Sequence, residues 1–498
     1  MPNALRIGFV VSEFTPLCKT GGLADVAGAL PPALAAEGHQ VAVFCPYYRE
    51  AAAALKKLNL TAAEVLAPFP LWLGNELRFT PSIHEVRLHG FTAYLVKCDP
   101  LYDRDGLYQQ AGRDWPDNLV RFSLFAQASL EAMLLLGLEL DILHSHDWQA
   151  ALVPVQLHHR RGLGPLCSVP RVLTIHNLGY QGVFEPGEFP LLNLPGSAFS
   201  VDCLEYYGKL NLLKAGIICA DWVTTVSPTY SREILTAEFG AGLEGVLHAV
   251  SHKLSGIING IEDTVWDPAA DEFLPANYSA DKPEGKRECK RRLLAEVGLP
   301  EDPGRPLIGM ITRLASQKGL DLVVQAADAL LAREVALVVL GTGDPELHQA
   351  LTALAGKYPD RLAVLLKFDN ALAHRIEAGA DMFLMPSRYE PCGLNQMYSM
   401  RYGTIPVVSR VGGLKDTVIP YTADTAAAGT ARGFIMEEIS PEGLLKAVDQ
   451  ALGVYADTEA WARLVKHVMA LDFSWRSSAR QYAELYRRLL DERGGTAR

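Results

Sequence analysis

The 498-residue sequence has no apolar run long enough to cross a membrane and no excess of positive charge. One of its longest apolar stretches, 130–140, contains two glutamates and is shorter than the ~20 residues that a bilayer requires. The net charge of −11 argues against nucleic acid or an anionic membrane as a partner. No basic segment followed by a long apolar one precedes the first predicted strand, so we expect no secretory signal.

Cysteine pairs with the spacing of a zinc site are also missing. The eight cysteines are scattered along the chain, and no two of them form a CxxC pair. Most lie inside apolar runs, where a free thiol behaves as a small hydrophobic side chain. The sequence therefore predicts a cytoplasmic protein with no disulfide, no metal and no bound cofactor.

Two glycine-rich nucleotide fingerprints, GxGxxG and GxxxxGK[ST], are absent as well. Shortly after the first apolar run comes the stretch CKTGGLADVAGALPPAL, residues 18–34. This stretch either begins a helix with glycines at its start or cradles an anion. In the second case Gly21 and Gly22 would let backbone N–H groups approach a phosphate, and Lys19 would add a positive charge.

Short β-branched runs alternate with helical stretches along the chain, which predicts an α/β fold with parallel sheets. The length exceeds that of a single core, so we expect two domains. The region between 70 and 99 alternates instead and predicts a hairpin. The predicted strands are 6–13, 40–48, 141–147, 171–177 and 221–227 in the first half, and 305–313, 335–343, 361–368, 381–388, 405–410 and 433–436 in the second.

The second half repeats the pattern of the first: an apolar strand, a loop with a lysine and a glycine, then a helix. The nearly all-apolar strands indicate burial on both faces of the sheet. We therefore predict two Rossmann-like, doubly wound domains, with the carboxyl ends of their strands lining a central cleft. The predicted domains are 1–255 and 256–472. A final amphipathic helix, 473–498, either caps the second domain or crosses back to the first, and we favour the crossing.

Charged residues at strand ends in the second half suggest a site for a diphosphate. Arg313 and Lys318 follow a predicted strand and precede a helix, where a guanidinium and an ammonium suit a phosphate group. Glu390 follows another strand, and Cys392, Gly393 and Leu394 lead into the next helix. The alternatives are solvated surface charges and an acidic helix start stabilised by the helix dipole.

Polar residues at strand ends in the first half suggest recognition of sugar hydroxyls. His144, His146 and Asp147 end one strand and His176 ends the next. Neutral imidazole and carboxylate groups offer mixed donors and acceptors, and no HExxH motif supports a metal. The DxD sequence at 103–105 is either a turn or a metal–diphosphate site, and its Asp-Gly context favours the turn.

With these motifs in place, the chain resembles the family of bacterial glycogen synthases and plant starch synthases. These are retaining glucosyltransferases of the GT-B fold that use ADP-glucose. The absence of a predicted transit peptide favours the bacterial type, which serves glycogen biosynthesis. The motifs that carry the resemblance are KTGGLADVAGALP (19–31), HSHDWQA (144–150), TIHNLGYQG (174–182), TRLASQKGLD (312–321), PSRYEPCGLNQMYSMRYGT (386–404) and VGGLKDTV (411–418).

The resemblance implies roles for individual residues. Arg313 and Lys318 match the diphosphate-binding pair, and Glu390 matches the family's acidic residue. The second glutamate of the looser E-x7-E pattern is replaced by Tyr398. Phe368 is expected to stack on the adenine.

On the first-domain side, Lys19, Gly21 and Gly22 are expected to contact the donor, with Lys19 completing the site only when the cleft closes. Asp147 and His176 would hold the glucose, with Asn259 in support, and Tyr108 would line the sugar site.

Three functions compete for a chain with these features. The leading one is transfer of glucose from ADP-glucose to the non-reducing end of an α-1,4-glucan with retention. A nicotinamide-dependent oxidoreductase would share the Rossmann halves but requires the missing GxGxxG. A glucan-binding protein without activity would have no use for a diphosphate clamp. The sequence leaves open the oligomeric state and the strictness of ADP-glucose over UDP-glucose.

Overall fold

The computed structural model describes residues 4–110 and 112–496. The chain divides into two compact units. Unit 1 comprises 1–226, 231–260 and 475–498, and unit 2 comprises 227–230 and 261–474. No helix in the described ranges is both long and apolar enough to cross a bilayer.

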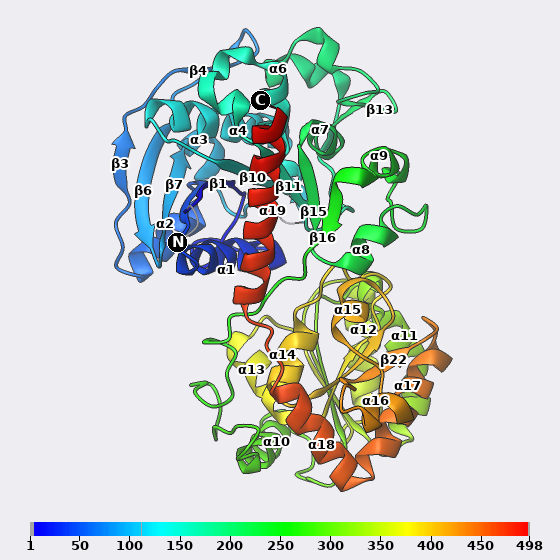
Figure 1. Cartoon of the computed structure of the whole chain (residues 1–498). Coiled ribbons are helices and arrows are strands. Elements are labelled where there is room, and N and C mark those ends of the chain that lie inside the picture. The colour runs from blue at the N-terminus through cyan, green and yellow to red at the C-terminus, as the bar shows by residue number, and fades with distance from the viewer. Residues whose placement is uncertain (1–3, 111, 497–498) are drawn as a thin grey trace. The chain divides into compact units, whose positions relative to one another are not determined.

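Unit 1 is built on a mixed sheet whose described strands run in the order β16-β15-β11-β10-β1-β2-β7-β6-β3 (Figure 1). Neighbours from β16 to β7 are parallel, whereas β7, β6 and β3 pair antiparallel, which places the predicted hairpin at one edge. The strands are β1 (Arg6–Val10), β2 (Gln40–Pro46), β3 (Ala63–Leu66), β6 (Ser82–Leu88), β7 (Phe91–Lys97), β10 (Ile142–His146), β11 (Arg171–Ile175), β15 (Trp222–Thr225) and β16 (Leu254–Gly256).

Smaller ladders and helices complete unit 1. The small strands are β4 (Leu71–Leu73), β5 (Leu77–Phe79), β8 (Gln109–Gln110), β9 (Arg113–Asp114), β12 (Val183–Phe184), β13 (Glu205–Tyr206) and β14 (Lys209–Asn211). The helices are α1 (Gly22–Ala36), α2 (Arg49–Lys57), α3 (Asp99–Tyr102), α4 (Asn118–Leu135), α5 (Asp147–Ala150), α6 (Leu152–His159), α7 (Leu212–Cys219), α9 (Glu244–Ala249) and α19 (Trp475–Thr496), with α8 (Pro228–Glu233) where the chain passes between units.

Unit 2 contains a parallel sheet with the described order β19-β18-β17-β20-β21-β22. This order is that of a doubly wound Rossmann fold. The strands are β17 (Leu307–Ile311), β18 (Ala336–Leu340), β19 (Leu362–Leu365), β20 (Met382–Met385), β21 (Ile405–Ser409) and β22 (Phe434–Met436). The helices are α10 (Glu284–Glu296), α11 (Leu320–Leu331), α12 (Pro345–Lys357), α13 (Asn370–Gly379), α14 (Asn395–Arg401), α15 (Gly412–Thr417), α16 (Ala423–Ala427), α17 (Pro441–Tyr455) and α18 (Thr458–Met469).

Helices cover both faces of the unit 2 sheet, with α10 and α13 on one side and α11 and α17 on the other (Figure 1). The strands are therefore buried on both sides, which explains why their sequences are nearly all apolar rather than alternating. The core between α10, α13 and the strands is formed by leucine, alanine and valine side chains together with Phe383.

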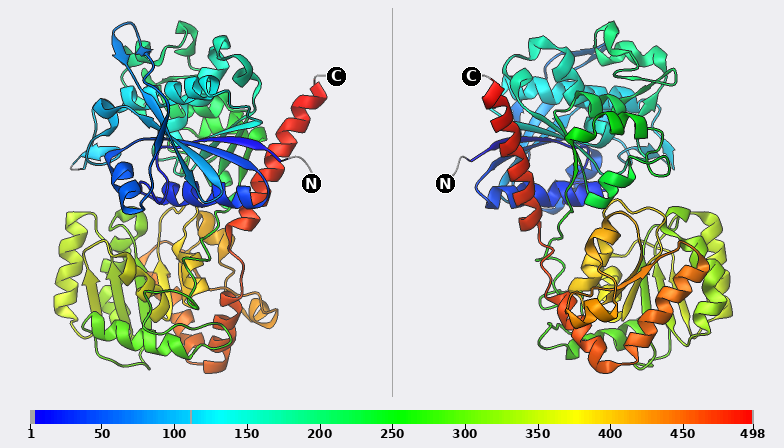
Figure 2. Two further views of the ribbon diagram at one scale, coloured as in Figure 1. Left: turned by 90° about the vertical axis from the view of Figure 1, so that its left-hand side faces the viewer. Right: turned by 45° about the vertical axis from the view of Figure 1, so that its right-hand side comes forward.

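The C-terminal helix α19 packs across α1 of unit 1 (Figure 2). Ser478 Oγ donates to the carbonyl of Ile258 at 2.6 Å, and the guanidinium of Arg488 stacks over the ring of Trp222. The helix crosses back to the first unit instead of capping the second.

A buried chain of polar groups joins α19 to three strands. The Tyr486 hydroxyl lies 2.7 Å from His144 Nδ1, and His144 Nε2 lies 2.6 Å from Thr174 Oγ1. Thr174 Oγ1 in turn contacts Thr224 Oγ1 at 2.5 Å. Because His144 is fully buried, each of its ring nitrogens needs such a partner.

We expect Tyr486→Phe to destabilise unit 1 by ~1–3 kcal/mol, because it leaves His144 Nδ1 buried without a hydrogen bond. Calorimetric transition temperatures measure the effect. Tyr48→Phe is the matched control: Tyr48 is equally buried, and its hydroxyl has no hydrogen-bond partner among the described residues. An equal loss in both variants would contradict the role assigned to the His144 contact.

Candidate active site

A pocket of about 210 Å³ lies at the carboxyl ends of β17 and β20 in unit 2. The strand order places the topological switch point between these two strands, because the chain continues to β18 on one side and to β21 on the other. Ligands of open α/β sheets bind at this position. The pocket is lined by Met310, Ile311, Thr312, Arg313, Lys318, Leu384, Met385, Pro386, Ser387, Glu390, Gly393, Leu394 and Asn395.

A buried ion pair forms part of the pocket wall. Lys318 Nζ lies 2.6 Å from Glu390 Oε2, and the Ser387 hydroxyl donates to the same oxygen at 3.0 Å. Glu390 is only 7% exposed. Removing one member of such a pair leaves an uncompensated charge away from water. The lysine and the glutamate, which the sequence placed on separate motifs, therefore act as one unit.

Two glycines let the loops of the pocket approach each other. Gly319 has φ +71°, and a Cβ there would lie 2.0 Å from the carbonyl oxygen of Pro386. Gly412 has φ +42°, and a Cβ there would lie 2.0 Å from the carbonyl oxygen of Glu390. A side chain at either position would be strained and would push the loops that carry Lys318 and Glu390 out of place.

The two arginines of this region have different surroundings. Arg313 lines the pocket and is exposed, and its side chain has no ion pair or hydrogen bond within the described ranges. Arg388 turns away to Asp321, with both guanidinium–carboxylate distances at 2.7 Å. Arg388, which lies in the same sequence motif as Glu390, holds the η5 turn (Ser316–Lys318) and the start of α11.

Only some of the remaining site residues predicted in unit 2 line the pocket. Gly393 and Leu394 line the pocket, whereas Cys392 is buried and is not part of the lining. Helix α14 begins at Asn395, three residues after Cys392. The predicted strand through Phe368 is too long, because β19 ends at Leu365. Phe368 instead lies in the following loop, where the residue is 85% exposed.

Unit 1 has an equivalent switch point between β1 and β10. Ser12 and Glu13 follow β1, while Asp147 follows β10 and His176 follows β11. His146 Nδ1 lies 3.0 Å from His176 Nε2, and the backbone N–H of His176 donates to Asp147 Oδ1 at 2.7 Å. The structure thus gathers the first-half polar residues at one edge of the sheet.

Burial raises the pKa of two carboxyl groups at this edge. The pKa of Asp147 rises to about 7, although backbone N–H groups of His176 and Asn177 oppose the shift. The pKa of Glu13 also rises to about 7, although hydrogen bonds from Thr20 oppose the shift.

Asp147 has φ +55°, a left-handed backbone conformation that is uncommon outside glycine. Strained backbone of this kind persists where surrounding contacts fix it, often at functional sites.

The histidines at this edge are neutral at physiological pH. Burial lowers the pKa of His176 to about 3 and the pKa values of His144 and His146 well below their usual range. Both nitrogens of His144 contact hydroxyl groups, so this residue belongs to the core rather than to a binding surface. His176 is partly exposed and can offer a neutral imidazole to a hydroxyl.

The loop before α1 is held by acidic residues. Lys19 Nζ pairs with Asp25 Oδ1 at 2.6 Å, and the Thr20 hydroxyl donates to Glu13 Oε2 at 2.8 Å. A Cβ at Gly21 or Gly22 would meet no atom within 4 Å among the described residues. Internal packing therefore does not require these two glycines, which leaves the surface above them open.

Three further features that the sequence analysis discussed lie in unit 1: Tyr108, the DxD sequence and Asn259. The Tyr108 hydroxyl lies 2.7 Å from Ser12 Oγ, so the tyrosine reaches the carboxyl end of β1. Asp103 and Asp105 both pair with Arg49, which satisfies the DxD carboxylates without a metal. Asn259 is buried, and its Oδ1 has no hydrogen-bond partner in the described part of the chain.

The sequence motifs did not single out Ser12, Glu13 or Ser387. Glu13 stands directly after an apolar strand, as Glu390 nearly does, so the rule that singled out Glu390 could have found it. Ser387 lies between the strand and Glu390, and no sequence pattern indicates its hydrogen bond.

Two doubly wound units, each with polar and charged groups at its switch point, are the architecture of GT-B glycosyltransferases. Residues 6–249 match the family described as "Starch synthase catalytic domain", and residues 295–465 match "Glycosyl transferases group 1". The chain belongs to the glycogen synthase family, as its similarity to whole members shows.

A glycogen synthase of Anaeromyxobacter sp. (strain Fw109-5) is 49% identical over 97% of this chain and 99% of its own. One of Koribacter versatilis is 45% identical over 97% and 98%. The catalytic domain of starch synthase IV from Arabidopsis thaliana, solved with ADP and acarbose, has a TM-score of 0.89 and 34% identity over 98% of this chain and 100% of that structure. Sucrose-phosphate synthase from Thermosynechococcus elongatus, at 18% identity and a TM-score of 0.58, shares the fold.

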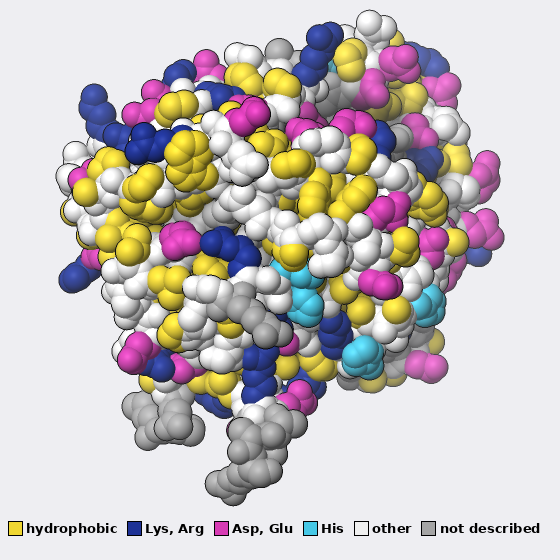
Figure 3. All heavy atoms as spheres, turned by 90° about the horizontal axis from the view of Figure 1, so that it is seen from above, with side chains coloured by type: hydrophobic (Ala, Val, Ile, Leu, Met, Phe, Trp, Pro, Cys, Tyr) yellow, Lys and Arg dark blue, Asp and Glu magenta, His cyan; other side chains and the backbone are white. Residues whose placement is uncertain are grey.

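Figure 3 shows one face of the molecule, on which acidic and basic side chains are interspersed with hydrophobic ones. The net charge of the whole sequence is −11.

We expect the stability of unit 1 to fall as pH rises from about 4 to 7, in part because of Asp147. Its pKa is raised in the folded state, so the folded chain holds a proton that the unfolded chain releases, and this stabilisation is lost as pH approaches 7. Asp147→Asn should flatten the decline by roughly 1–3 kcal/mol between pH 5 and pH 8.

Calorimetry of the parent and of Asp147→Asn across this pH range measures the effect, with Glu13 supplying the slope that remains. Asp141→Asn is the control, because Arg6 lowers the pKa of Asp141 and any loss from this residue occurs at more acidic pH. A parent and an Asp147→Asn variant with parallel curves would contradict the assignment.

Proposed function

We propose that this chain transfers glucose from ADP-glucose to the non-reducing end of an α-1,4-glucan with retention of configuration. The observation that carries the proposal is the Lys318–Glu390 pair with Arg313 at the switch point of unit 2. The similarity to glycogen synthases over nearly the whole chain supports it. A cytoplasmic location stays a prediction of the sequence.

In this proposal the pocket of unit 2 binds the diphosphate of the donor. Arg313 is exposed and otherwise unengaged among the described residues, so its planar guanidinium is available to phosphate oxygens. Lys318 adds a second positive charge, shared with Glu390. The exposed ring of Phe368, in the loop after β19, stacks on the nucleobase. ADP bound to the starch synthase IV neighbour supports this choice of nucleotide.

The edge of unit 1 holds the sugars. Asp147 and His176 exchange hydrogen bonds with glucose hydroxyls as donors and acceptors. Asn259 offers an amide oxygen that lacks a partner in the described structure. Tyr108 lines the same edge through its contact with Ser12. Lys19 and the open surface above Gly21 and Gly22 contact the donor.

The neutral state of His176 favours attack of the acceptor hydroxyl on the same face of the glucose that the diphosphate leaves. Double displacement needs a carboxylate nucleophile, and the group expected in that position is the neutral imidazole of His176. In the proposed step the bond from the anomeric carbon to the β-phosphate oxygen breaks as the acceptor's 4-hydroxyl oxygen bonds to that carbon. The departing β-phosphate takes the acceptor's proton, and Arg313 and Lys318 stabilise its charge.

The test of donor and reaction type is direct. Purified chain is given ADP-glucose and UDP-glucose in competition with a maltooligosaccharide acceptor, and the anomer of the new linkage is determined. We expect α-linked extension and preference for ADP-glucose. Thermal stabilisation by NAD rather than by ADP would instead favour an oxidoreductase.

We predict that Lys318→Met lowers kcat by about 100-fold with a smaller change in the KM for ADP-glucose, because it removes a preorganised cation from the leaving group. Arg313→Met should behave similarly. Steady-state kinetics measure both. Arg333→Met is the control. Arg333 follows the C-terminal end of α11, away from Lys318, and pairs with Asp449.

Addition of Mg²⁺ or Mn²⁺ to chelated parent enzyme should not raise its rate. If it restored a lost activity, the cation clamp would be wrong, and Asp103 and Asp105 would need to be considered as metal ligands.

We predict that Glu390→Gln also removes most of the turnover, because the carboxylate stabilises positive charge that develops on the sugar. Glutamine keeps the size of the side chain and can still accept from Ser387 and Lys318, which protects the fold. Since the two residues act as a pair, the double variant Lys318→Met/Glu390→Gln should lose much less than the product of the single effects. Near-parental kcat in Glu390→Gln, with binding of ADP intact, would sink the catalytic role.

A further inference from the structure

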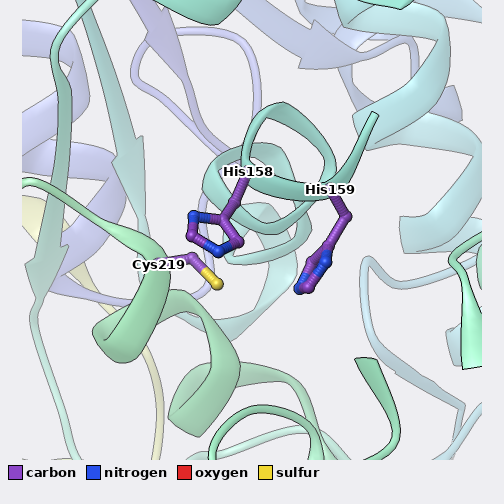
Figure 4. A group of neighbouring side chains, drawn as sticks. All are labelled: His158, His159 and Cys219. Atoms are coloured by element: carbon purple, nitrogen blue, oxygen red, sulfur yellow. The ribbon is translucent and has the colours of Figure 1, made fainter. Parts of the chain in front are cut away.

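A cluster of two histidines and two cysteines lies in unit 1 away from the strand ends described above. His158 and His159 end helix α6, Cys219 ends helix α7, and Cys203 precedes β13. Figure 4 shows both imidazole rings projecting from α6 toward the region of the Cys219 sulfur. These side chains come from three separate segments of the chain.

Two distances within the cluster match those between ligands of one metal ion. In a tetrahedral zinc site with bonds of ~2.3 Å to sulfur and ~2.1 Å to nitrogen, two sulfurs stand about 3.8 Å apart, and sulfur and nitrogen about 3.6 Å apart. Cys203 Sγ lies 3.9 Å from Cys219 Sγ and 3.6 Å from His159 Nε2. Ligand atoms of His158, His159 and Cys219 all lie within 4.8 Å of one another.

Two lysines fix the backbone on either side of each sulfur. Lys214 Nζ donates to the carbonyls of Val201 and Glu205, which flank Cys203. Lys253 Nζ donates to the carbonyls of Ile218 and Ala220, which flank Cys219. The sulfur positions are therefore held by surrounding contacts, as the outer shell of a metal site requires.

The cluster lies at the amino-end edge of the sheet. Helices α6 and α7 follow β10 and precede β15 respectively, and their C-terminal ends lead into the starts of β11 and β15. Asp147 and His176 lie at the opposite edge, where the parallel strands end. A metal bound here would join α6, α7 and the turn before β13 without contacting the proposed substrates.

We propose that His158, His159, Cys203 and Cys219 bind a single Zn²⁺ ion as a structural site. Zinc prefers imidazole and thiolate ligands in tetrahedral geometry, and a Cys₂His₂ set closes the coordination shell. His158 is exposed and gives the ion a path from solvent, while both cysteines are buried. This revises the sequence-based expectation of no metal, which rested on the absence of a CxxC pair.

The test uses the full chain, purified under reduction without chelator. We expect about one zinc per chain by elemental analysis. After removal of zinc and addition of Co²⁺, a thiolate-to-cobalt charge-transfer band and the visible bands of tetrahedral cobalt should appear. Cys203→Ala/Cys219→Ala should abolish the charge-transfer band, and His159→Ala should weaken zinc binding by at least about 10-fold.

Cys98→Ala is the matched control, a buried cysteine of the same unit that lies outside the cluster. It should bind metal as the parent does, and circular dichroism should show that all variants are folded. Zinc content no higher in the parent than in the double cysteine variant would overturn the proposal. So would a charge-transfer band that persists without the two cysteines, or a Cys203–Cys219 disulfide in freshly isolated, metal-free protein.

Discussion

When two adjacent parallel strands are followed by helices on opposite faces of the sheet, a crevice stays open at the carboxyl ends of these strands. The chain creates this situation twice, between β1 and β10 and between β17 and β20. Most of the polar residues proposed to act on substrate lie beside these two openings or in loops that follow neighbouring strands. The apolar strands, the buried helices and the glycine contacts between loops can be understood as what keeps the two openings in shape.

The two units handle acidic groups in different ways. Unit 2 pairs Glu390 with Lys318. Among the described residues, unit 1 gives Asp147 and Glu13 no comparable ion pair, and burial raises their pKa values instead. An ion pair suits stabilisation of charge in a transition state, whereas groups that titrate near neutrality suit hydrogen bonding to sugar hydroxyls.

Much of the fold could be predicted from the sequence, because strands buried on both faces must be apolar throughout and such runs are easily recognised. The positions of His176, Arg313 and Glu390 agree with the rule that polar residues after parallel strands gather at one edge. The Lys318–Glu390 pair could not be predicted, since 72 residues separate its members and only the folded loops bring them together. The exposure of Phe368 and the turn of Arg388 toward Asp321 depend on where single strands and turns end, which propensity does not fix.

Because α19 belongs to unit 1, this unit can finish folding only after residues 261–474 of unit 2 have been synthesised. Residues 1–260 are synthesised before residues 261–474, yet His144 Nδ1 finds its hydroxyl partner only when Tyr486 has been made. Residues 261–474 form a nearly continuous unit and can fold in the interval. The region around α1 therefore keeps an uncovered face until the residues of α19 have been synthesised and have packed on it.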